Sequence, residues 1–363
     1  MKLQVTQENL AKALSTVARV ATNRGTLPVL ANVLIKTVDN RLAISATNLD
    51  IAITQHIGSK ISEEGAITIP ARLLQDFVNT LPSGVIDIRL DEYKLKLKSG
   101  SYTSSINGIS AEDFPVMPAI QQKNPWTLPS KLCREALQQV VVAASNDDAR
   151  PVLTGVYIHT FEGSMYMVAT DSYRLAEKKL QSSSNDISLL IPANAMQDLL
   201  RIVSDNEEDI EVYHDDQQVL FRVGEVELVT RLIDGNYPDY RKLIPEKFTS
   251  TARLQKQEFL NLTKIASLFA RESAGSIVVS VDESDGQVQV QSVASQLGEN
   301  SSKADATVTG EGKITLNSRY LLDVLGVLKG SEVEFCFNGK LEPSLIRDPA
   351  DKDYKHVIMP LKS

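Results

Sequence analysis

The chain repeats one set of sequence features three times, and this repetition constrains its fold more than any other property. The clearest repeat reads IPARLLQDFVNTLPSG from Ile69 and returns as IPANAMQDLLRIVSDN from Ile191 and LNSRYLLDVLGVLKGS from Leu316. The copies begin 122 and 125 residues apart (69 to 191, 191 to 316). Solenoid repeats have periods of about 20–50 residues. A period this long predicts repeated domains instead.

Two further features lie upstream of each copy in the same order. One is SATNLD (45–50), VATDSY (168–173) and the weaker SVASQL (292–297), and the other is a helical stretch, ENLAKALSTVARV, SKLCREALQQVVV and KQEFLNLTKIASL. A chain of 363 residues is long enough for two or three domains. Polar stretches with a proline, QQKNP and PEKFTS, separate the repeats. We therefore predict domains at 1–122, 125–246 and 248–363.

Hydrophobic periodicity predicts the same elements in each repeat. Leu10, Leu14, Val17 and Ala21 lie on one face of a helix, whereas VQVQSV (288–293) and EVEFCF (332–337) alternate as half-buried strands do. Each repeat is expected to hold a short strand, a helix, two or three strands, a second helix and two or three more strands. This order predicts an α+β fold with helices on one face of antiparallel sheets.

Composition excludes several classes of protein. No apolar run approaches the roughly 20 residues of a membrane helix, and the first residues, MKLQVTQENL, lack the apolar core of a signal peptide. Cys133 and Cys336 are too few for a zinc site or a disulfide framework, and the four histidines are scattered. We expect a cytoplasmic protein with no metal, no cofactor and no membrane contact.

The net charge of −8 argues against nucleic-acid binding, but the charge is unevenly distributed. The six predicted helices together carry +7, which leaves −15 for the rest of the chain; they are 9–24, 71–81, 131–145, 193–204, 256–271 and 317–329. A mildly positive helical surface on an acidic protein suits a polyanion that is held through its phosphates without sequence readout.

Several local strings, in order along the whole chain, are similar to those of one known family. They are RGTLPVLANVLI, ATNLDIAI, AEDFPVMP, NDDARPVLTGVYI, ATDSYRLA, DGNYPDYRKLIP, EPSLIRD and the terminal VIMPL. With the threefold repeat, they make the chain resemble the bacterial DNA polymerase III beta subunits, the sliding clamps. The resemblance implies three clamp domains per chain and a head-to-tail homodimer. In that ring, helices line the hole and sheets form the outer shell.

The resemblance also implies a function without catalysis, that of a DNA polymerase processivity factor. Such a ring encircles double-stranded DNA without sequence preference. It tethers the polymerase catalytic subunit, the clamp loader, other polymerases and repair proteins through a short peptide motif. Because the ring holds DNA topologically, weak binding is sufficient, and overall acidity discourages DNA from adhering to its outside.

The family's DNA-facing positions and its dimer contact can be carried over residue by residue. The DNA-facing positions match Arg24 and Arg72, with Lys12, Arg19, Arg150 and Arg201 as further candidates. Asn194 stands where relatives often have a basic residue, which puts a DNA contact there in doubt. The dimer contact matches Leu268 and Phe269. Leu268 points away from the apolar helical face of Phe259, Leu262 and Ala266.

The family's partner cleft lies on the second and third domains. The matching positions are Leu153, Thr170, Ser172, Tyr173, Arg174, Leu175, Pro238, Lys242, Leu243, Pro343, Val357, Ile358, Met359, Pro360 and Leu361. They describe an apolar trough with a few polar groups, suited to a short peptide with aliphatic and aromatic anchors. The alternative is that Leu153, Leu175 and Ile358 are only core. The tail Lys362–Ser363 departs from the commoner methionine- or leucine-rich ends.

Two other classes of function stay open at this point. Asp147, Asp148 and Asp171 could serve a carboxylate-dependent hydrolase, although N-D-D and T-D are also turn sequences, and no glycine-rich phosphate loop accompanies them. The other alternative is a non-catalytic three-domain scaffold that does not bind DNA. Trp126 and the ten tyrosines form no base-stacking stripe, so Trp126 is expected to pack at a domain junction.

Overall fold

The computed structural model describes residues 1–22, 27–115, 120, 125–204, 207–294 and 298–361. The chain divides into two compact units, and each combines distant segments. Unit 1 is Met1–Lys131 with Asp198–Leu232, and unit 2 is Leu132–Gln197 with Ile233–Ser363. The second sequence repeat is therefore shared between the two units. The three domain limits drawn from the sequence stay a prediction.

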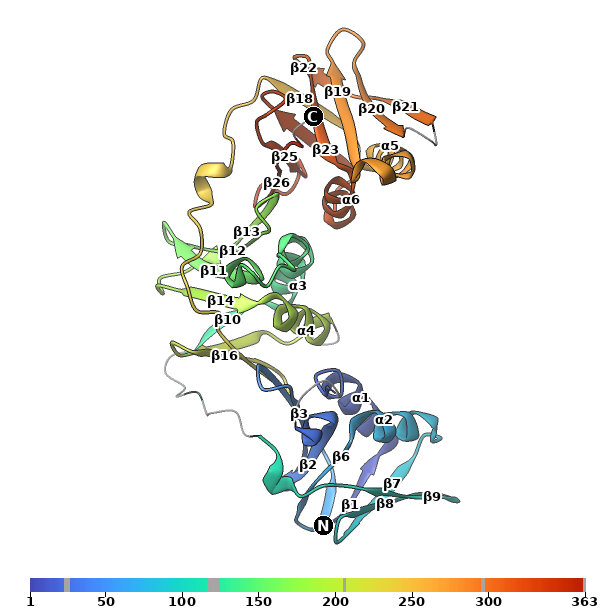
Figure 1. Ribbon diagram of the computed structural model, residues 1–363. Coiled ribbons are helices and arrows are strands. Elements are labelled where there is room, and N and C mark those ends of the chain that lie inside the picture. Colours follow the sequence, from blue (N-terminus) through green and yellow to red (C-terminus); the bar gives the residue numbers. More distant parts are fainter. Residues whose placement is uncertain (23–26, 116–119, 121–124, 205–206, 295–297, 362–363) are drawn as a thin grey trace. The chain divides into compact units, whose positions relative to one another are not determined.

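The first two repeats have the same order of elements, except that the first has one additional short strand between its two helices (Figure 1). The first contains β1 (Lys2–Thr6), α1 (Gln7–Val17), β2 (Asn32–Val38), β3 (Arg41–Thr47), β4 (Ile51–Ile57), β5 (Lys60–Glu63), β6 (Ala66–Pro70), α2 (Ala71–Thr80), β7 (Val85–Asp91), β8 (Lys94–Ser99) and β9 (Tyr102–Asn107). The second contains β10 (Trp126–Leu128), α3 (Ser130–Val140), β11 (Gly155–Phe161), β12 (Ser164–Thr170), β13 (Arg174–Ser182), β14 (Ser188–Pro192), α4 (Ala193–Ser204), β15 (Ile210–His214), β16 (Gln218–Val223) and β17 (Val226–Arg231).

The third repeat follows the same order. It contains β18 (Ser250–Gln255), α5 (Lys256–Phe269), β19 (Ser276–Asp282), β20 (Gln287–Ala294), β21 (Gly298–Asp305), β22 (Thr307–Thr309), β23 (Gly312–Asn317), α6 (Ser318–Val327), β24 (Glu332–Phe337), β25 (Ser344–Arg347) and β26 (Tyr354–Ile358). The predicted element order is confirmed, with one correction. Four or five strands lie between the two helices of a repeat, where two or three were expected.

The strands form four sheets, and their pairing confirms the predicted α+β class with antiparallel sheets. All pairs of named strands are antiparallel in the described part of the chain. The sheet orders are β5-β1-β7-β8-β9, β10-β15-β16-β17-β4-β3-β2-β6, β14-β11-β12-β13-β26-β25-β24-β18-β22 and β21-β20-β19-β23. The helices α1 and α2 pack side by side, as do α5 and α6 (Figure 1).

The two large sheets each join strands from consecutive repeats. In unit 1, β4 of the first repeat pairs with β17 of the second, with Ile51 opposite Thr230. In unit 2, β13 of the second repeat pairs with β26 of the third, with Leu175 opposite Val357. The last strand of one repeat therefore extends the sheet of the preceding repeat. This is why the compact units do not follow the sequence repeats.

The hairpin before each of these junction strands has the same hydrogen bonds in both units. In residues 170–174, the Thr170 hydroxyl donates to the Arg174 carbonyl and accepts from the Ser172 N–H, at 2.6 and 3.2 Å. In residues 47–51, the Thr47 hydroxyl makes the corresponding bonds at 2.9 and 3.1 Å. Ser172 and Leu49 both have positive φ, 75° and 81°. The sequence repeat is therefore a repeat of hydrogen-bond geometry.

The helices bury the apolar face that the sequence predicts. Thr6 caps α1 by accepting from the Asn9 N–H at 3.3 Å, and Leu10, Leu14 and Val17 are buried against the sheet. The predicted helix 9–24 is nevertheless too long, because α1 ends at Val17. The predicted packing role of Trp126 fits its burial in β10. No helix of the described chain is long and apolar enough to cross a membrane.

A buried histidine on β26 should make the protein acid-sensitive. Burial, with a smaller contribution from the Arg174 charge, lowers the pKa of His356 to about 3. Its Nδ1 bonds the Tyr354 hydroxyl at 2.8 Å, whereas Nε2 has no hydrogen-bond partner in the described structure. The unfolded chain, with a histidine pKa of about 6.5, takes up the proton first as the pH falls.

We therefore expect the free energy of unfolding to fall between about pH 6.5 and about pH 3, by roughly 1.4 kcal/mol per pH unit for this group. The measurement is the thermal unfolding midpoint from pH 7.5 to pH 5. Burial and the Arg241 charge also lower the pKa of His159, which adds loss in the same direction. His356→Gln should reduce the pH slope, and an unchanged slope would contradict this assignment.

Candidate functional site

The predicted partner cleft centres on the strand pair β13·β26 in unit 2. Arg174 lies opposite Ile358, and the Met359 N–H donates to the Tyr173 carbonyl at 2.8 Å. The ladder therefore continues past the end of β26 to the hairpin tip. Two segments that are far apart in the sequence, 170–175 and 357–359, are brought together as the cleft prediction requires.

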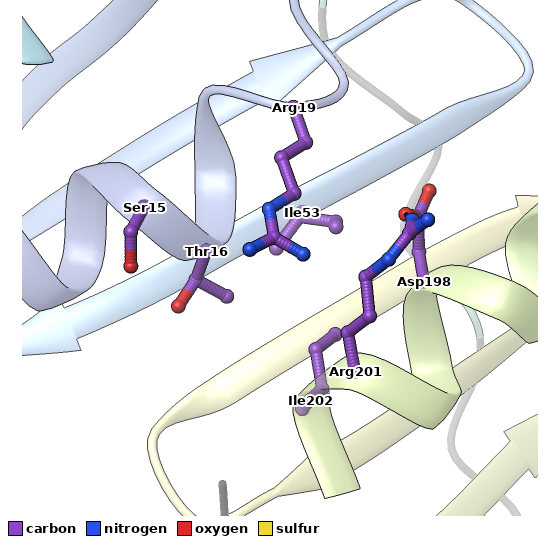
Figure 2. A pocket seen from close by; sticks show the side chains of 7 residues that line it. All are labelled: Ser15, Thr16, Arg19, Ile53, Asp198, Arg201 and Ile202. Carbon is purple, nitrogen blue, oxygen red and sulfur yellow. Dashed lines mark hydrogen bonds and ion pairs between the residues drawn. The ribbon is translucent and has the colours of Figure 1, made fainter. Parts of the chain in front are cut away.

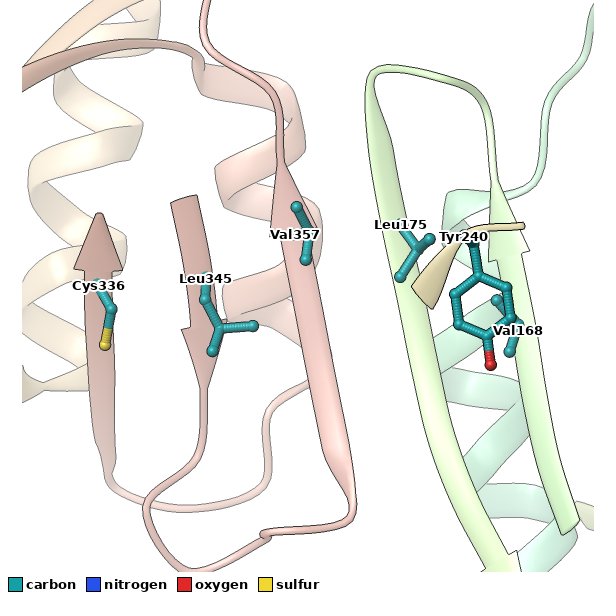
Figure 3. Packing of buried hydrophobic residues seen from close by; sticks show 6 residues of the cluster. All are labelled: Val168, Leu175, Tyr240, Cys336, Leu345 and Val357. Atoms are coloured by element: carbon teal, nitrogen blue, oxygen red, sulfur yellow. The ribbon is translucent and has the colours of Figure 1, made fainter. Parts of the chain in front are cut away.

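A buried apolar cluster runs beneath this strand pair. Figure 3 shows Val168, Leu175 and Tyr240 on one side and Val357, Leu345 and Cys336 on the neighbouring strands. Ile244 packs against the same cluster. Tyr240 directly precedes the short 3₁₀ helix η5 (Arg241–Leu243), so the cluster anchors the segment that carries Lys242 and Leu243.

Burial separates the fifteen predicted cleft residues into three groups. Six are buried: Leu153, Thr170, Arg174, Leu175, Val357 and Ile358. Five are exposed: Ser172, Tyr173, Pro238, Lys242 and Leu243. Pro343, Met359, Pro360 and Leu361 are half-buried. The buried group is core, as the alternative interpretation held for Leu153, Leu175 and Ile358, so only the other two groups can be reached by a peptide without rearrangement.

The polar side of the cleft contains residues that sequence reasoning missed. The Arg174 guanidinium donates to Asp171 at 3.0 Å and to Asp323 at 2.5 Å, and it lies 4.5 Å from the ring centre of Tyr320. Asp323 and Tyr320 are on α6, about 150 residues further along the chain. No local pattern signals such a contact. The pairs hold the buried Arg174 in one position beneath the hairpin.

A pocket of about 380 Å³ lies beside this ion-pair network. Its lining includes Arg150, Tyr173 and Arg174 together with Arg319 and Tyr320. The Arg150 guanidinium donates to the Ser172 hydroxyl at 2.9 Å and lies 3.8 Å from Asp147. Arg150, expected to face DNA, thus shares a pocket with predicted cleft residues.

Two of the three carboxylates considered for catalysis accept hydrogen bonds from the local backbone. Asp171 accepts from the Tyr173 and Arg174 N–H groups, both at 2.9 Å. Asp147 accepts from the Ala149 N–H at 3.0 Å, and Asp148 is exposed. These bonds are typical of turns in which Asp stabilises the backbone two or three residues ahead.

Replacing Asp171 with Asn should therefore cost stability. The amide oxygen can still accept from the backbone, but the charge that pairs with the buried Arg174 is removed, and we expect a loss of about 1–3 kcal/mol. Urea unfolding followed by circular dichroism measures it. Asp148→Asn is the matched control and should change stability by less than about 0.5 kcal/mol. Equal effects would remove the ion pair from the explanation.

In unit 1, the structure brings two of the predicted DNA-contacting residues together. Arg19, just after α1, and Arg201, on α4, line one shallow pocket with Asp198 and Ile53 (Figure 2). Arg201 pairs with Asp198 at 2.7 Å. Burial raises the pKa of Asp198, an effect that the charges of Arg201 and Arg19 partly oppose. One carboxylate therefore offsets part of the local positive charge.

The other predicted DNA-contacting residues lie apart from this pocket. Lys12 is exposed on α1 and Arg72 is exposed on α2. Arg24 lies outside the described residues. Asn194, at the start of α4, is exposed, and its side-chain oxygen accepts from the Ala195 N–H at 2.8 Å.

The charge bias of the helices is smaller than the sequence predicted. With the observed bounds, α3 and α5 each carry +1 and the other four helices are neutral, so the total is +2 and not +7. The observed α1 includes Glu8, which adds a negative charge to the count. Three cations that the prediction counted lie just beyond the ends of α1, α5 and α6, namely Arg19, Arg271 and Lys329. The predicted count of +7 was too high, because hydrophobic spacing overestimates the length of a helix that ends in a turn.

The predicted dimer contact lies on α5 in unit 2. Phe259, Leu262 and Ala266 are buried there, whereas Leu268 is 52% exposed. Phe269 is half-buried, and Ile265 is a further exposed apolar side chain that sequence reasoning did not name. The helical face assignment of Leu268 is confirmed, and its contact with a second copy stays a prediction.

Comparison with known proteins adds independent information. Three family models match in order: the N-terminal domain of the DNA polymerase III beta subunit at residues 1–118, its central domain at 127–239 and its C-terminal domain at 241–362. The beta sliding clamp of Staphylococcus aureus is 30% identical over 376 residues, and that of Bacillus subtilis is 29% identical over 377. Both alignments cover 100% of each protein.

Solved structures agree over the whole chain. The Bacillus subtilis sliding clamp has a TM-score of 0.94 at 28% identity, with 100% of this chain and 99% of that chain covered. A Pseudomonas aeruginosa sliding clamp bound to griselimycin has a TM-score of 0.95 at 26% identity, with both chains fully covered. With three family models in order and a full-length relative at 30% identity, this chain belongs to the family of bacterial DNA polymerase III beta subunits, the beta sliding clamps.

Proposed function

We propose that two copies of this chain close into a ring around duplex DNA and act as a processivity factor in replication. The ring holds the polymerase catalytic subunit, other polymerases, repair proteins and the clamp loader through the cleft on the second and third repeats. It acts in the cytoplasm and requires no cofactor. The observation that carries the proposal is the regular way in which strands of successive repeats pair.

Pairing between successive repeats leaves one strand of the first repeat and one of the third without such a partner in the described chain. The junction strand β4 begins at Ile51, β13 at Arg174 and β21 at Gly298, at nearly constant spacing. The strand β17 pairs with β4, and β26 pairs with β13. These partner strands are the last strands of the second and third repeats, and β9 is the corresponding last strand of the first repeat. Both β9 and β21 are edge strands of their sheets.

A second copy of the chain can provide hydrogen-bonding partners for both edge strands, β9 and β21. If β21 of one copy pairs with β9 of the next, each junction repeats the geometry of β4·β17 and β13·β26. This contact is head-to-tail, and two such contacts close a ring when the rotation per repeat is regular. The helix α5 packs on β21, so Leu268 and Phe269 lie close to the proposed contact.

DNA is held by enclosure more than by affinity. The cations Arg24, Arg72, Lys12, Arg19 and Arg201 would contact phosphates from the helical side, and Arg150 is a weaker candidate because it lies beside the cleft. A small excess of positive charge is enough for this purpose, because a topologically linked ring needs only to slide. The net charge of −8 is compatible with that role.

Binding to a short linear duplex should accordingly be weak and fall steeply with salt. Arg24→Ala or Arg19→Ala should weaken it for every sequence and lower the slope of log K against log salt by about 1 for each phosphate that the variant no longer neutralises. Fluorescence anisotropy of a labelled duplex at several salt concentrations measures both quantities. Lys36→Ala, an exposed strand position, is the matched control. Tight binding to one particular sequence would contradict the proposal.

The proposed protein has no catalytic activity of its own. Nuclease, polymerase and nucleotidase assays should therefore show no turnover with or without metal. Reproducible turnover abolished by Asp171→Asn would favour the hydrolase alternative.

The decisive experiment for the whole proposal is primer extension on a primed circular template with polymerase and clamp loader. Product length should increase strongly when this protein is added. Failure to be loaded onto circular DNA would favour a scaffold that does not act on DNA.

A further inference from the structure

The five-stranded sheet of the first repeat has one face whose side chains are exposed on its three central strands, β1, β7 and β8. In β5-β1-β7-β8-β9, the buried face carries apolar side chains, among them Leu3, Ile88 and Leu97. The opposite face carries Lys2, Arg89 and the lysines of KLKLK in β8. This second positive surface is made of strands, whereas the sequence count treated everything outside the helices as acidic.

Three cations of this face lie directly opposite one another. Lys2 is the cross-strand partner of Arg89, and Arg89 is the cross-strand partner of Lys96. Cβ atoms at such positions are about 4.5–5.5 Å apart, and like charges there are destabilising. The face therefore retains an electrostatic arrangement that costs stability, which is typical of a surface that binds a ligand of opposite charge.

The neighbouring positions neutralise only part of this charge. Glu63 lies opposite Lys2 on the other side, Asp87 lies opposite Lys98, and Asp91 pairs with Lys96 at 2.6 Å. Lys2 and Arg89 make no ion pair within the described residues. These two cations are therefore available to an external anion.

The face is also hollowed. A trough of about 570 Å³ runs over it, and its charged lining residues are five cations and one carboxylate: Lys2, Lys60, Arg89, Lys96, Lys98 and Asp87. Ser62, Thr103 and Ser105 also line it. No aromatic side chain is among its lining residues in the described chain, so bases would find nothing on which to stack. Its size suits a few residues of extended chain and is small for a duplex.

We propose that this trough binds an extended acidic peptide segment of a partner protein. Alternate side chains of an extended peptide are about 6.6–6.8 Å apart, which is also the spacing of Lys96 and Lys98 along β8. Carboxylates at every second position can thus face Lys96 and Lys98, while Arg89 and Lys2 on the neighbouring strands add positive charge beside Lys96. The proposed ring uses the edge of β9 and leaves this face open.

The test uses the full-length protein and a fluorescein-labelled short peptide of alternating Glu and Ser, followed by anisotropy at low and high salt. We expect saturable binding that weakens with salt. The double variant Lys2→Gln/Arg89→Gln should lose about five- to tenfold in affinity. Lys36→Gln, on β2 of the other sheet of unit 1, should retain it. A peptide of alternating Gln and Ser should not bind.

The stability of the variant is part of the test. Because the substitutions relieve like-charge repulsion, its thermal midpoint should equal or exceed that of the parent. Its mass in solution should also be unchanged, which separates this site from ring closure. Equal peptide affinity of parent and double variant would overturn the proposal. The proposal would also be overturned if an oligonucleotide displaced the peptide from the parent protein and did not bind the double variant. A change in the oligomeric state of the double variant would overturn it as well.

Discussion

A chain that ends at Ile358 should no longer bind partner peptides. Deleting Met359–Ser363 removes the half-buried Met359, Pro360 and Leu361 from one wall of the cleft. Anchors buried in an apolar pocket contribute roughly 2–4 kcal/mol each, so the affinity should fall at least about 100-fold. Calorimetric titration with a peptide that contains Gln and aliphatic or aromatic anchors measures this decrease. Processive synthesis should be abolished in parallel.

The same deletion should leave the rest of the protein intact. Among described backbone hydrogen bonds it removes those from the Met359 N–H to Tyr173 and from the Leu361 N–H to Thr315, at 2.8 and 2.9 Å. Each such bond contributes about 1 kcal/mol, while the buried Val357 and Ile358 stay in place. Dimer mass and weak DNA binding should be unchanged. Deleting only Lys362–Ser363 is the control, and undiminished peptide affinity after the longer deletion would place the site elsewhere.

Replacing Leu268 with Asp should yield folded monomers. Leu268 is 52% exposed, so the charge costs little in an isolated chain, but in a closed contact it would be buried without a partner. We expect the dimer dissociation constant to rise at least about 100-fold. Light scattering gives the mass, and circular dichroism shows whether the fold persists.

The matched control is Leu341→Asp. Leu341 is 73% exposed and lies between β24 and β25, outside α5 and the two strands proposed to pair. The Leu341→Asp variant should remain dimeric. If Leu268→Asp is also an intact dimer, Leu268 is not in the interface, and the proposed β9·β21 pairing would need a different helix beside it.

The sequence alone determined the threefold repeat, the order of elements and the family resemblance. Each rests on local information. Leu10, Leu14 and Val17 recur at helical spacing, and EVEFCF alternates, because one face of each element is buried. The hairpin hydrogen bonds of 47–51 and 170–174 follow from Thr and Asx side chains that bond their own backbone.

Sequence could also name most of the cleft candidates, but not their roles. Burial showed that Leu153 and Ile358 are core, whereas Tyr173 and Leu243 are available at the surface. Arg150 was matched to DNA contact by position, yet it hydrogen-bonds Ser172 beside the cleft. The side chain's direction and partners decide such roles, and they depend on neighbours that are distant in the chain.

The tertiary structure alone decided how the repeats combine and where the charge lies. Pairing between β4 and β17 and between β13 and β26 depends on which sheet edges are free, and no window of sequence contains both strands. The helix charge fell from +7 to +2 once helix ends were fixed by turns. The row of Lys2, Arg89 and Lys96 exists only because three strands align in register. Cross-strand register is set by long-range packing, which a linear pattern does not record.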